Sequence, residues 1–225
     1  MGNQAPKNLV LASMSSADFG LIEPHLEAVD LPLRKVLERR GRPIKAVYFP
    51  SSGFASVVAD GGKIPIEVGL IGREGSTGIP IILGANRSEH ETFMQAAGEG
   101  HCVRTSSLRE AIDKSPALHR VLLRAVNGFL NQATRTAVAN GRAKIDERLA
   151  RWLLMADDRL DEDEMPITHE FLAMMLAVRR PGVTTAIQAL ERAGLIATKR
   201  SRLTILDREG LEKRSNGHYA QADYS

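Results

Sequence analysis

The chain has 225 residues, of which 43% are hydrophobic and 25% are charged, and its formal net charge is only +3. This length allows one or two domains with their own cores, and the small net charge excludes a polycation that binds nucleic acid over its whole surface. The single cysteine, Cys102, excludes an internal disulfide and an iron–sulfur cluster held by four thiolates. With no apolar run long enough to span a bilayer and no export signal, the sequence indicates a cytoplasmic protein.

The first forty residues carry few regular patterns. Residues 1–18 are polar and are expected to be loose. Phe19–Asp30 has apolar residues at helical spacing and predicts a small helix that Pro24 interrupts. Leu31–Arg40 combines apolar and basic residues, which predicts a strand or a short helix at the entrance to a sheet.

From residue 44 to residue 105 the pattern changes to short apolar runs separated by glycine-rich turns. Runs at a spacing of roughly ten residues are typical of strands in an antiparallel sandwich or barrel. Such a barrel has room for a small ligand, but nothing in the pattern requires one. The predicted strands are Ala46–Phe49, Gly53–Ala59, Ile64–Leu70, Ile79–Leu83, Thr92–Ala97 and His101–Thr105.

A helix over Ser106–Ser115 is predicted to lead into a much longer helix that begins at Pro116, since proline is well tolerated in a first turn. The apolar residues of the long helix recur at three- and four-residue steps. Two interpretations remain open, because the stripe can pack against its own barrel or against the same helix of a second chain. We favour the second, with an interface formed by Leu118, Leu122, Ala125, Val126, Phe129 and Ala133.

Asn140-Gly141 is a strong turn signal and predicts the end of the long helix and a hinge. The expected organisation is a barrel domain over residues 1–114, the long helix with its hinge over 115–142, and a third part over 143–225. This third part begins with a predicted helix over Ala143–Ala156 and an acidic loop over Asp157–Glu164. Beyond Asp207 we expect a short helix and a frayed tail.

Two short helices around a tight turn are predicted between Ile167 and Gly194. Thr168 can cap the first helix with its hydroxyl. Val178-Arg179-Arg180 ends it, because the residue before a proline avoids the helical region. Pro181 suits the first turn of the second helix, and Gly194 suits its end. Together these signals indicate a helix-turn-helix.

Two apolar runs, Leu195–Thr198 and Leu203–Leu206, flank the basic tip Lys199–Arg202 and predict a hairpin, the wing of a winged helix. Between Leu176 and Ile205 the sequence has six basic residues and a single acidic residue, Glu191. This local excess is typical of a surface that binds phosphates. The alternative is a solvated charged helix pair that packs on another element.

A barrel, a long helix, a hinge and a winged helix in this order resemble the Crp/Fnr superfamily of bacterial transcription regulators. The resemblance is specific over Ala143–Leu206 and weaker over Val47–Thr105. It implies an α+β fold, with an N-terminal antiparallel β-barrel or jelly roll like a cyclic-nucleotide-binding domain, a dimerisation helix and a C-terminal winged helix-turn-helix. The residues that carry it are Ile145–Ala150 (IDERLA), Ile167-Thr168, the Leu172–Leu176 helix, Val178-Arg179-Arg180, Val183, Leu190-Glu191 and Gly194-Leu195-Ile196.

The resemblance also implies a homodimer that binds double-stranded DNA, with RNA polymerase as a further expected partner. Arg180 falls on the family's base-contacting arginine, a side chain suited to guanine O6 and N7. Pro181 stands where the family often has glutamate, and Thr185 where it commonly has arginine, so the operator should differ from the best-known one. The candidate DNA-binding residues are Thr168, His169, Arg179, Arg180, Gly182, Thr184, Thr185, Gln188, Lys199, Arg200 and Arg202.

The barrel departs further from the family's cyclic-nucleotide pattern. Gly72–Gly75 precedes Arg87-Ser88 by a longer spacing than the family uses, and Glu89 stands where alanine belongs. We therefore expect no response to cyclic AMP and no cofactor, although haem ligation by His101 or Cys102 stays open. Any pocket for another effector is placed at Glu74, Arg87, Ser88 and Thr134.

No nucleophile elbow, P-loop or cluster of metal ligands is found in the sequence, so neither catalysis nor a metal site is expected. His90 with Glu89 and Glu91 is the one carboxylate–imidazole cluster, and it falls in a predicted loop. The main rival to a DNA-binding regulator is a protein-interaction or small-ligand-binding barrel module that dimerises through its long helix. A gel shift with genomic fragments distinguishes the two, because a regulator retains its operator in the presence of competitor DNA and an interaction module shows no sequence preference.

Overall fold

The structure, a computed structural model, describes residues 6–62, 65–200 and 202–221. These residues form two compact units. The first contains the chain up to Val57 and Leu70–Asn131, and the second contains Val58–Gly69 and Gln132–Gln221. None of the helices in the described ranges is long and apolar enough to cross a membrane.

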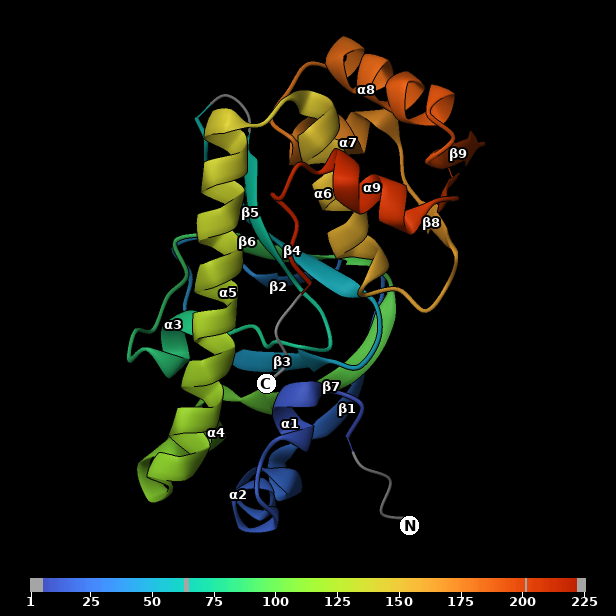
Figure 1. The fold of residues 1–225 in the computed structure, drawn as a ribbon. Helices are drawn as coiled ribbons and strands as arrows, with labels where there is room; N and C mark the ends of the chain where they lie inside the picture. The colour runs from blue at the N-terminus through green and yellow to red at the C-terminus, as the bar shows by residue number, and fades with distance from the viewer. Residues whose placement is uncertain (1–5, 63–64, 201, 222–225) are drawn as a thin grey trace. The chain divides into compact units, whose positions relative to one another are not determined.

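The first unit is built mainly on two antiparallel sheets in a jelly-roll-like arrangement, of which Val58, Ala59 and Ile66–Gly69 group with the second unit (Figure 1). The arrangement confirms the predicted fold class but is not a closed barrel. One sheet has the order β1-β7-β3, in which Tyr48 and Glu27 both pair with Cys102 of β7. The other has the order β2-β6-β4-β5. The strands are β1 (Glu27–Leu31), β2 (Val36–Glu38), β3 (Ala46–Pro50), β4 (Phe54–Ala59), β5 (Ile66–Ile71), β6 (Glu91–Ala96) and β7 (Gly98–Arg104).

Short helices replace two of the predicted features of this unit. The strand predicted over Ile79–Leu83 is wrong, since Ile79–Ile82 forms helix α3, preceded by Gly78 at a left-handed φ of 74°. A short apolar run does not distinguish a strand from a buried helix by its pattern. The helix predicted over Phe19–Asp30 is α2 (Ser16–Ile22) followed by the 3-10 helix η1 (Glu23–His25) and β1. Within the polar start, α1 (Leu9–Ala12) is folded, while residues 1–5 and Ile64, part of a predicted strand, lie outside the described residues.

Helix α4 (Thr105–Lys114) leads into α5 (Pro116–Arg142), as predicted. Leu118, Leu122 and Val126 are buried in the core of the first unit, together with residues of α1, α3 and α4. The predicted dimer interface is therefore wrong for these three residues, because their apolar side chains already pack against their own chain. Helix α5 ends at Arg142, one residue beyond the break predicted at Asn140-Gly141, and the hinge there stays a prediction.

The second unit is a winged helix-turn-helix, as predicted. Its core is formed by apolar residues of three packed helices, such as Leu153 of α6, Leu172 of α7 and Ile187 of α8. A small antiparallel sheet with the order β8-β10-β9 completes it. Its elements are α6 (Ile145–Asp157), β8 (Glu164–Pro166), α7 (His169–Met175), α8 (Arg180–Arg192), β9 (Ile196–Lys199), β10 (Arg202–Ile205) and α9 (Arg208–Arg214).

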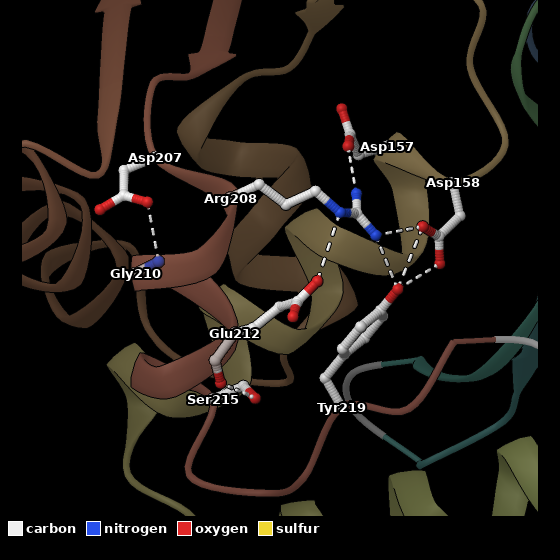
Figure 2. A network of polar contacts seen from close by, with 8 residues as sticks. All are labelled: Asp157, Asp158, Asp207, Arg208, Gly210, Glu212, Ser215 and Tyr219. Atoms are coloured by element: carbon white, nitrogen blue, oxygen red, sulfur yellow. Dashed lines mark hydrogen bonds and ion pairs between the residues drawn. The ribbon is translucent and has the colours of Figure 1, made fainter.

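The segment after α9 is tied down as far as Tyr219 by a polar network (Figure 2). Arg208 donates to Asp157 at 2.5 Å and to Asp158 at 2.6 Å, and the hydroxyl of Tyr219 donates to Asp158 at 2.8 Å. Burial and the bond to Asp158 raise the pKa of Tyr219, so the phenol stays protonated. The predicted frayed tail is thus wrong up to Tyr219, and residues 222–225 lie outside the described residues.

Candidate nucleic-acid interface

The first helix of the motif is capped at both ends. The hydroxyl of Thr168 accepts from the backbone N–H of Phe171 at 3.2 Å, which satisfies one donor of the first turn. At the other end Ala177 adopts a left-handed φ of 50°, and the N–H of Val178 donates to the carbonyl of Ala173 at 3.0 Å. This bond is that of a Schellman cap, which ends α7 sharply and turns the chain toward α8.

Helix α8 is held against α6 at close range. Its inner face buries Val183, Ile187 and Leu190. A Cβ at Gly182 would lie 3.2 Å from the Cδ1 atom of Ile145, so glycine allows the start of α8 to approach α6 closely. The guanidinium of Arg148 on α6 donates to the carbonyl of Leu176 in the turn. The first turn of α8 is therefore held by packing, and the end of α7 before it is held by a charged hydrogen bond.

The exposed end of α8 carries free cations. Arg179 is the N-cap residue, Arg180 begins the helix, and both side chains are exposed. Lys199 and Arg200 on the wing are exposed as well. In the part of the chain that the structure describes, none of these four side chains makes a hydrogen bond or an ion pair. They remain available for phosphates and base edges, which are their natural partners in DNA complexes.

The hydroxyl and imidazole candidates on the two helices are already engaged. Thr184 donates to the carbonyl of Arg180 at 3.2 Å and contacts Nδ1 of His169 at 3.2 Å. Thr185 donates to the carbonyl of Pro181 at 3.0 Å. Each threonine oxygen still has acceptor capacity, whereas the exposed amide of Gln188 can both donate and accept.

The single acidic residue of α8, Glu191, joins this helix to the wing. The carboxylate of Glu191 accepts from the backbone N–H of Thr198 at 3.1 Å and from its hydroxyl at 2.6 Å. Arg202 on β10 pairs with Glu164 on β8 at 3.1 Å, and both side chains are more than half exposed. An exposed ion pair is weak, so it reduces the charge that Arg202 offers without removing it. Ser201, at the wing tip, lies outside the described residues.

The candidate effector residues do not form an anion cradle. Glu74 accepts from the backbone N–H of Gly72 at 3.1 Å, which closes its own loop. Arg87 is exposed and donates to the carbonyl of Gly41 at 2.8 Å. Ser88 is buried. These three residues belong to the first unit, whereas Thr134 is an exposed residue of α5 in the second.

A buried carboxylate that sequence reasoning missed lies beside Ser88. Glu38 on β2 accepts from the backbone N–H of Gly78 at 2.5 Å and from the hydroxyl of Thr92 at 3.5 Å. Burial raises the pKa of Glu38, while the bonds from Gly78, Ser88 and Thr92 and the nearby His90 lower it. The polar groups closest to Ser88 are thus already occupied by a side chain of the protein itself. No pattern in the sequence marks Glu38, because its partners lie about 40 to 54 residues away.

His101 and Cys102, the residues left open as haem ligands, lie on β7 between two paired strands. Burial raises the pKa of the Cys102 thiol, which disfavours the thiolate that binds metals. Among the described residues, no group of three or more His, Cys, Asp or Glu side chains is arranged to hold a metal ion.

Comparison with known proteins agrees with this architecture. Residues 147–214 match the model of the Crp-like helix-turn-helix domain. A transcriptional regulator of the Crp/Fnr family from Eubacterium rectale superposes with a TM-score of 0.72 at 16% identity, covering 91% of this chain and 96% of its own. FixK2 from Bradyrhizobium japonicum gives 0.71 at 17% identity, covering 88% and 99%.

A third similar structure is a CRP-family transcriptional regulator from Thermus thermophilus, with a TM-score of 0.69 at 19% identity and coverage of 88% and 100%. No sequence among the curated proteins matches this chain. Residues 147–214 thus carry a Crp-like helix-turn-helix domain, and over most of its length the chain has the fold of these solved structures, as the resemblance predicted.

Proposed function

We propose that this chain, which has the fold of the Crp/Fnr-type regulators, binds a specific DNA operator as a homodimer and regulates transcription in the cytoplasm, where its DNA lies. The observation that carries the proposal is the group of four exposed, unpaired cations, Arg179, Arg180, Lys199 and Arg200, at the leading end of α8 and on the wing of the described chain. Positive charge gathered on these two elements is the footprint of a DNA-binding surface.

In the proposed complex the first turn of α8 enters the major groove. Arg180 donates two hydrogen bonds to guanine O6 and N7, since a guanidinium matches that pair of acceptors. Arg179, Lys199 and Arg200 neutralise phosphates, and Arg202 contributes less because Glu164 competes for it. Thr168, His169, Gly182, Thr184, Thr185 and Gln188 line the same two helices and supply secondary contacts.

A second copy of the chain is the proposed partner of the outer face of α5. Leu123, Asn127, Leu130, Thr134 and Ala137 are all exposed and follow each other at steps of four and three residues, the spacing of a coiled-coil seam. Asn127 falls at the a position if the leucines take the d positions. A buried asparagine there pairs with its counterpart and favours two parallel helices in register. Phe129, Ala125 and Ala133 are half-buried beside the seam.

Leu130→Asp tests this seam. Placing a carboxylate opposite its own copy in an apolar contact should convert a dimer to monomers, because the two charges repel and lose their water. Asn131→Asp introduces the same charge one residue along, outside the seam, and should leave the mass unchanged. Sedimentation equilibrium measures both. A wild-type monomer, or a Leu130→Asp dimer of unchanged stability, contradicts the proposed interface.

The proposal includes no response to cyclic AMP, because Arg87 contacts the carbonyl of Gly41 and the groups around Ser88 are occupied by Glu38. An effector of another kind at Glu74, Arg87 and Ser88, and contact with RNA polymerase, remain parts of the proposal. Isothermal titration calorimetry with cyclic AMP should show no heat of binding.

Gel-shift titration of the wild-type protein with fragments of the source genome tests the function. A regulator retains a small set of fragments in excess competitor DNA, since specific binding exceeds non-specific binding by several kcal/mol. If competitor DNA abolishes the binding of all fragments equally, the result would instead support the rival hypothesis, a protein-interaction or ligand-binding module.

A further inference from the structure

A hairpin segment of the jelly-roll sequence belongs with the winged helix. Val58–Gly69, which contains the end of β4 and the start of β5, groups with the second unit. Glu67 in this segment is only 5% exposed, and Trp152 of α6 is 3% exposed. The indole N–H of Trp152 donates to Oε1 of Glu67 at 2.6 Å. A short bond between a buried donor and a buried carboxylate is among the stronger side-chain hydrogen bonds.

Trp152 connects this bond to the helix-turn-helix. Its ring meets the ring of Phe171 edge to face, with centroids 5.6 Å apart and an interplanar angle of 66°. Phe171 lies on α7, the first helix of the motif. One helical turn before Trp152, Arg148 donates to the carbonyl of Leu176 in the turn that leads to α8. Two side chains on one face of α6 therefore hold α7 and the turn.

The carboxylate of Glu67 also lies in the field of a buried cation. Arg151 on α6 donates to the hydroxyl of Thr136 at 3.0 Å and to the carbonyl of His218 at 3.0 Å. Burial lowers the pKa of Arg151 to about 10, and Glu67 counteracts this effect. The negative charge of Glu67 thus stabilises the cation that links α5, α6 and the C-terminal segment. A neutral residue at this position would leave that cation less well compensated.

We infer that Glu67 is a positioning residue for DNA recognition, which acts through Trp152 on the orientation of α7 and α8. This inference rests on the proposed function, and nothing in the comparisons assigns a role to either residue.

Hydrogen–deuterium exchange on the full-length protein, in wild type and Glu67→Ala, tests the inference without DNA. The amides of α7 and of the turn up to Arg180 should exchange faster in Glu67→Ala, while those of the first unit stay unchanged. Trp152 is the only tryptophan, so acrylamide quenching of its fluorescence should rise in the same variant. Glu91→Ala removes an exposed carboxylate of β6 and should behave as wild type in both measurements.

A second set of measurements, with DNA, determines the ratio of operator affinity to affinity for unrelated DNA. Glu67→Ala should lower this ratio about tenfold, the effect of losing a hydrogen bond to a charged group. Trp152→Phe keeps an aromatic ring beside Phe171 but lacks the N–H, and should lower the ratio similarly. Glu67→Gln still accepts from the indole and should recover to within about threefold of wild type.

Three outcomes overturn the inference: unchanged exchange in α7, equal acceleration of exchange in both units, or an unchanged affinity ratio in a folded Glu67→Ala protein. Equal acceleration would mean that Glu67 only contributes to overall stability. If the wild type retains no operator, the proposed function fails, and the exchange measurement still decides whether Glu67 holds α7.

Discussion

Polar side chains are exposed and unpaired in one region of the described chain and buried and hydrogen-bonded in another. The first region is the recognition surface, formed by the start of α8 and the wing, and the second is the effector region of the jelly roll around Ser88. At the start of α8 and on the wing, Arg179, Arg180, Lys199 and Arg200 are exposed and unpaired within the described part of the chain. In the jelly roll, Glu38 and Ser88 are buried and bonded to each other and to neighbouring groups. Free charge on a surface can still gain a partner, whereas buried groups that are already bonded have little to gain from one. The comparison favours DNA binding for the first region and a structural role for Glu38 in the second.

The largest expected effect comes from Arg180, the base-contacting member of the recognition surface. Arg180→Ala should cost about 1–3 kcal/mol of discrimination at one operator position, since a bidentate contact to guanine is lost. Quantitative binding to the operator and to its single-base variants measures this value. Arg179→Ala is the matched control, because it removes an adjacent cation and should weaken binding to all sequences alike. Unchanged base preference in Arg180→Ala would contradict the docking.

The wing should contribute affinity without sequence preference. Loss of two phosphate contacts per half-site in a Lys199→Ala, Arg200→Ala double variant should flatten the slope of log K against log salt by roughly 1.8 for each protomer bound. At about 0.15 M salt this corresponds to roughly a 30-fold loss of affinity per half-site on every sequence. Fluorescence anisotropy at several salt concentrations provides the slope. An effect confined to the operator would show that the wing contacts bases.

The buried carboxylate of Glu38 provides a test of the effector region through the pH dependence of stability. Because burial raises the pKa of Glu38, its stabilising contribution is complete below about pH 4.5 and is lost as the pH rises through its folded-state value. Glu38→Gln, which keeps an acceptor for the N–H of Gly78, should therefore flatten the fall in stability over that range. The change is at most about 1.4 kcal/mol per pH unit for one proton. Urea unfolding from about pH 4 to about pH 8 measures it, and an identical pH profile would rule out a buried, titrating Glu38.

The smallest effect is expected in the turn of the helix-turn-helix. Ala177 adopts a left-handed φ of 50°, which costs a residue with a Cβ roughly 1 kcal/mol. Ala177→Gly should raise the free energy of unfolding by a few tenths to about 1 kcal/mol, because part of the relief is lost to the entropy of the unfolded chain. Thermal and urea unfolding measure this change. A destabilised variant would show that the Cβ of Ala177 contributes more by packing than it loses by strain.

The two regions also differ in how much the sequence predicts. Thr168, Pro181 and Gly194 mark helix ends through interactions within one turn of the chain, and α7, α8 and the wing were all predicted within a few residues. Glu38 acquires its role from Gly78 and Thr92, contacts that no local pattern contains. The strand assignment of Ile79–Leu83 failed for a related reason, since a short apolar run acquires its structure from the core around it.

The long helix shows the same limit within a single element. Its apolar spacing predicted a helix over most of α5, which the structure confirms. The spacing could not distinguish the residues that pack on their own chain, Leu118, Leu122 and Val126, from the exposed residues Leu123 and Leu130. The two sets are interleaved along the helix, and only the position of the jelly roll decides between them.

Selection of binding sites from a random DNA pool by the wild-type protein tests the central claim most directly. We expect one enriched sequence with two inverted half-sites about one helical turn apart, because two copies of α8 related by a twofold axis must enter successive major grooves on one face of DNA. Enrichment of a single unsymmetric site, or of no sequence above the starting pool, would contradict it.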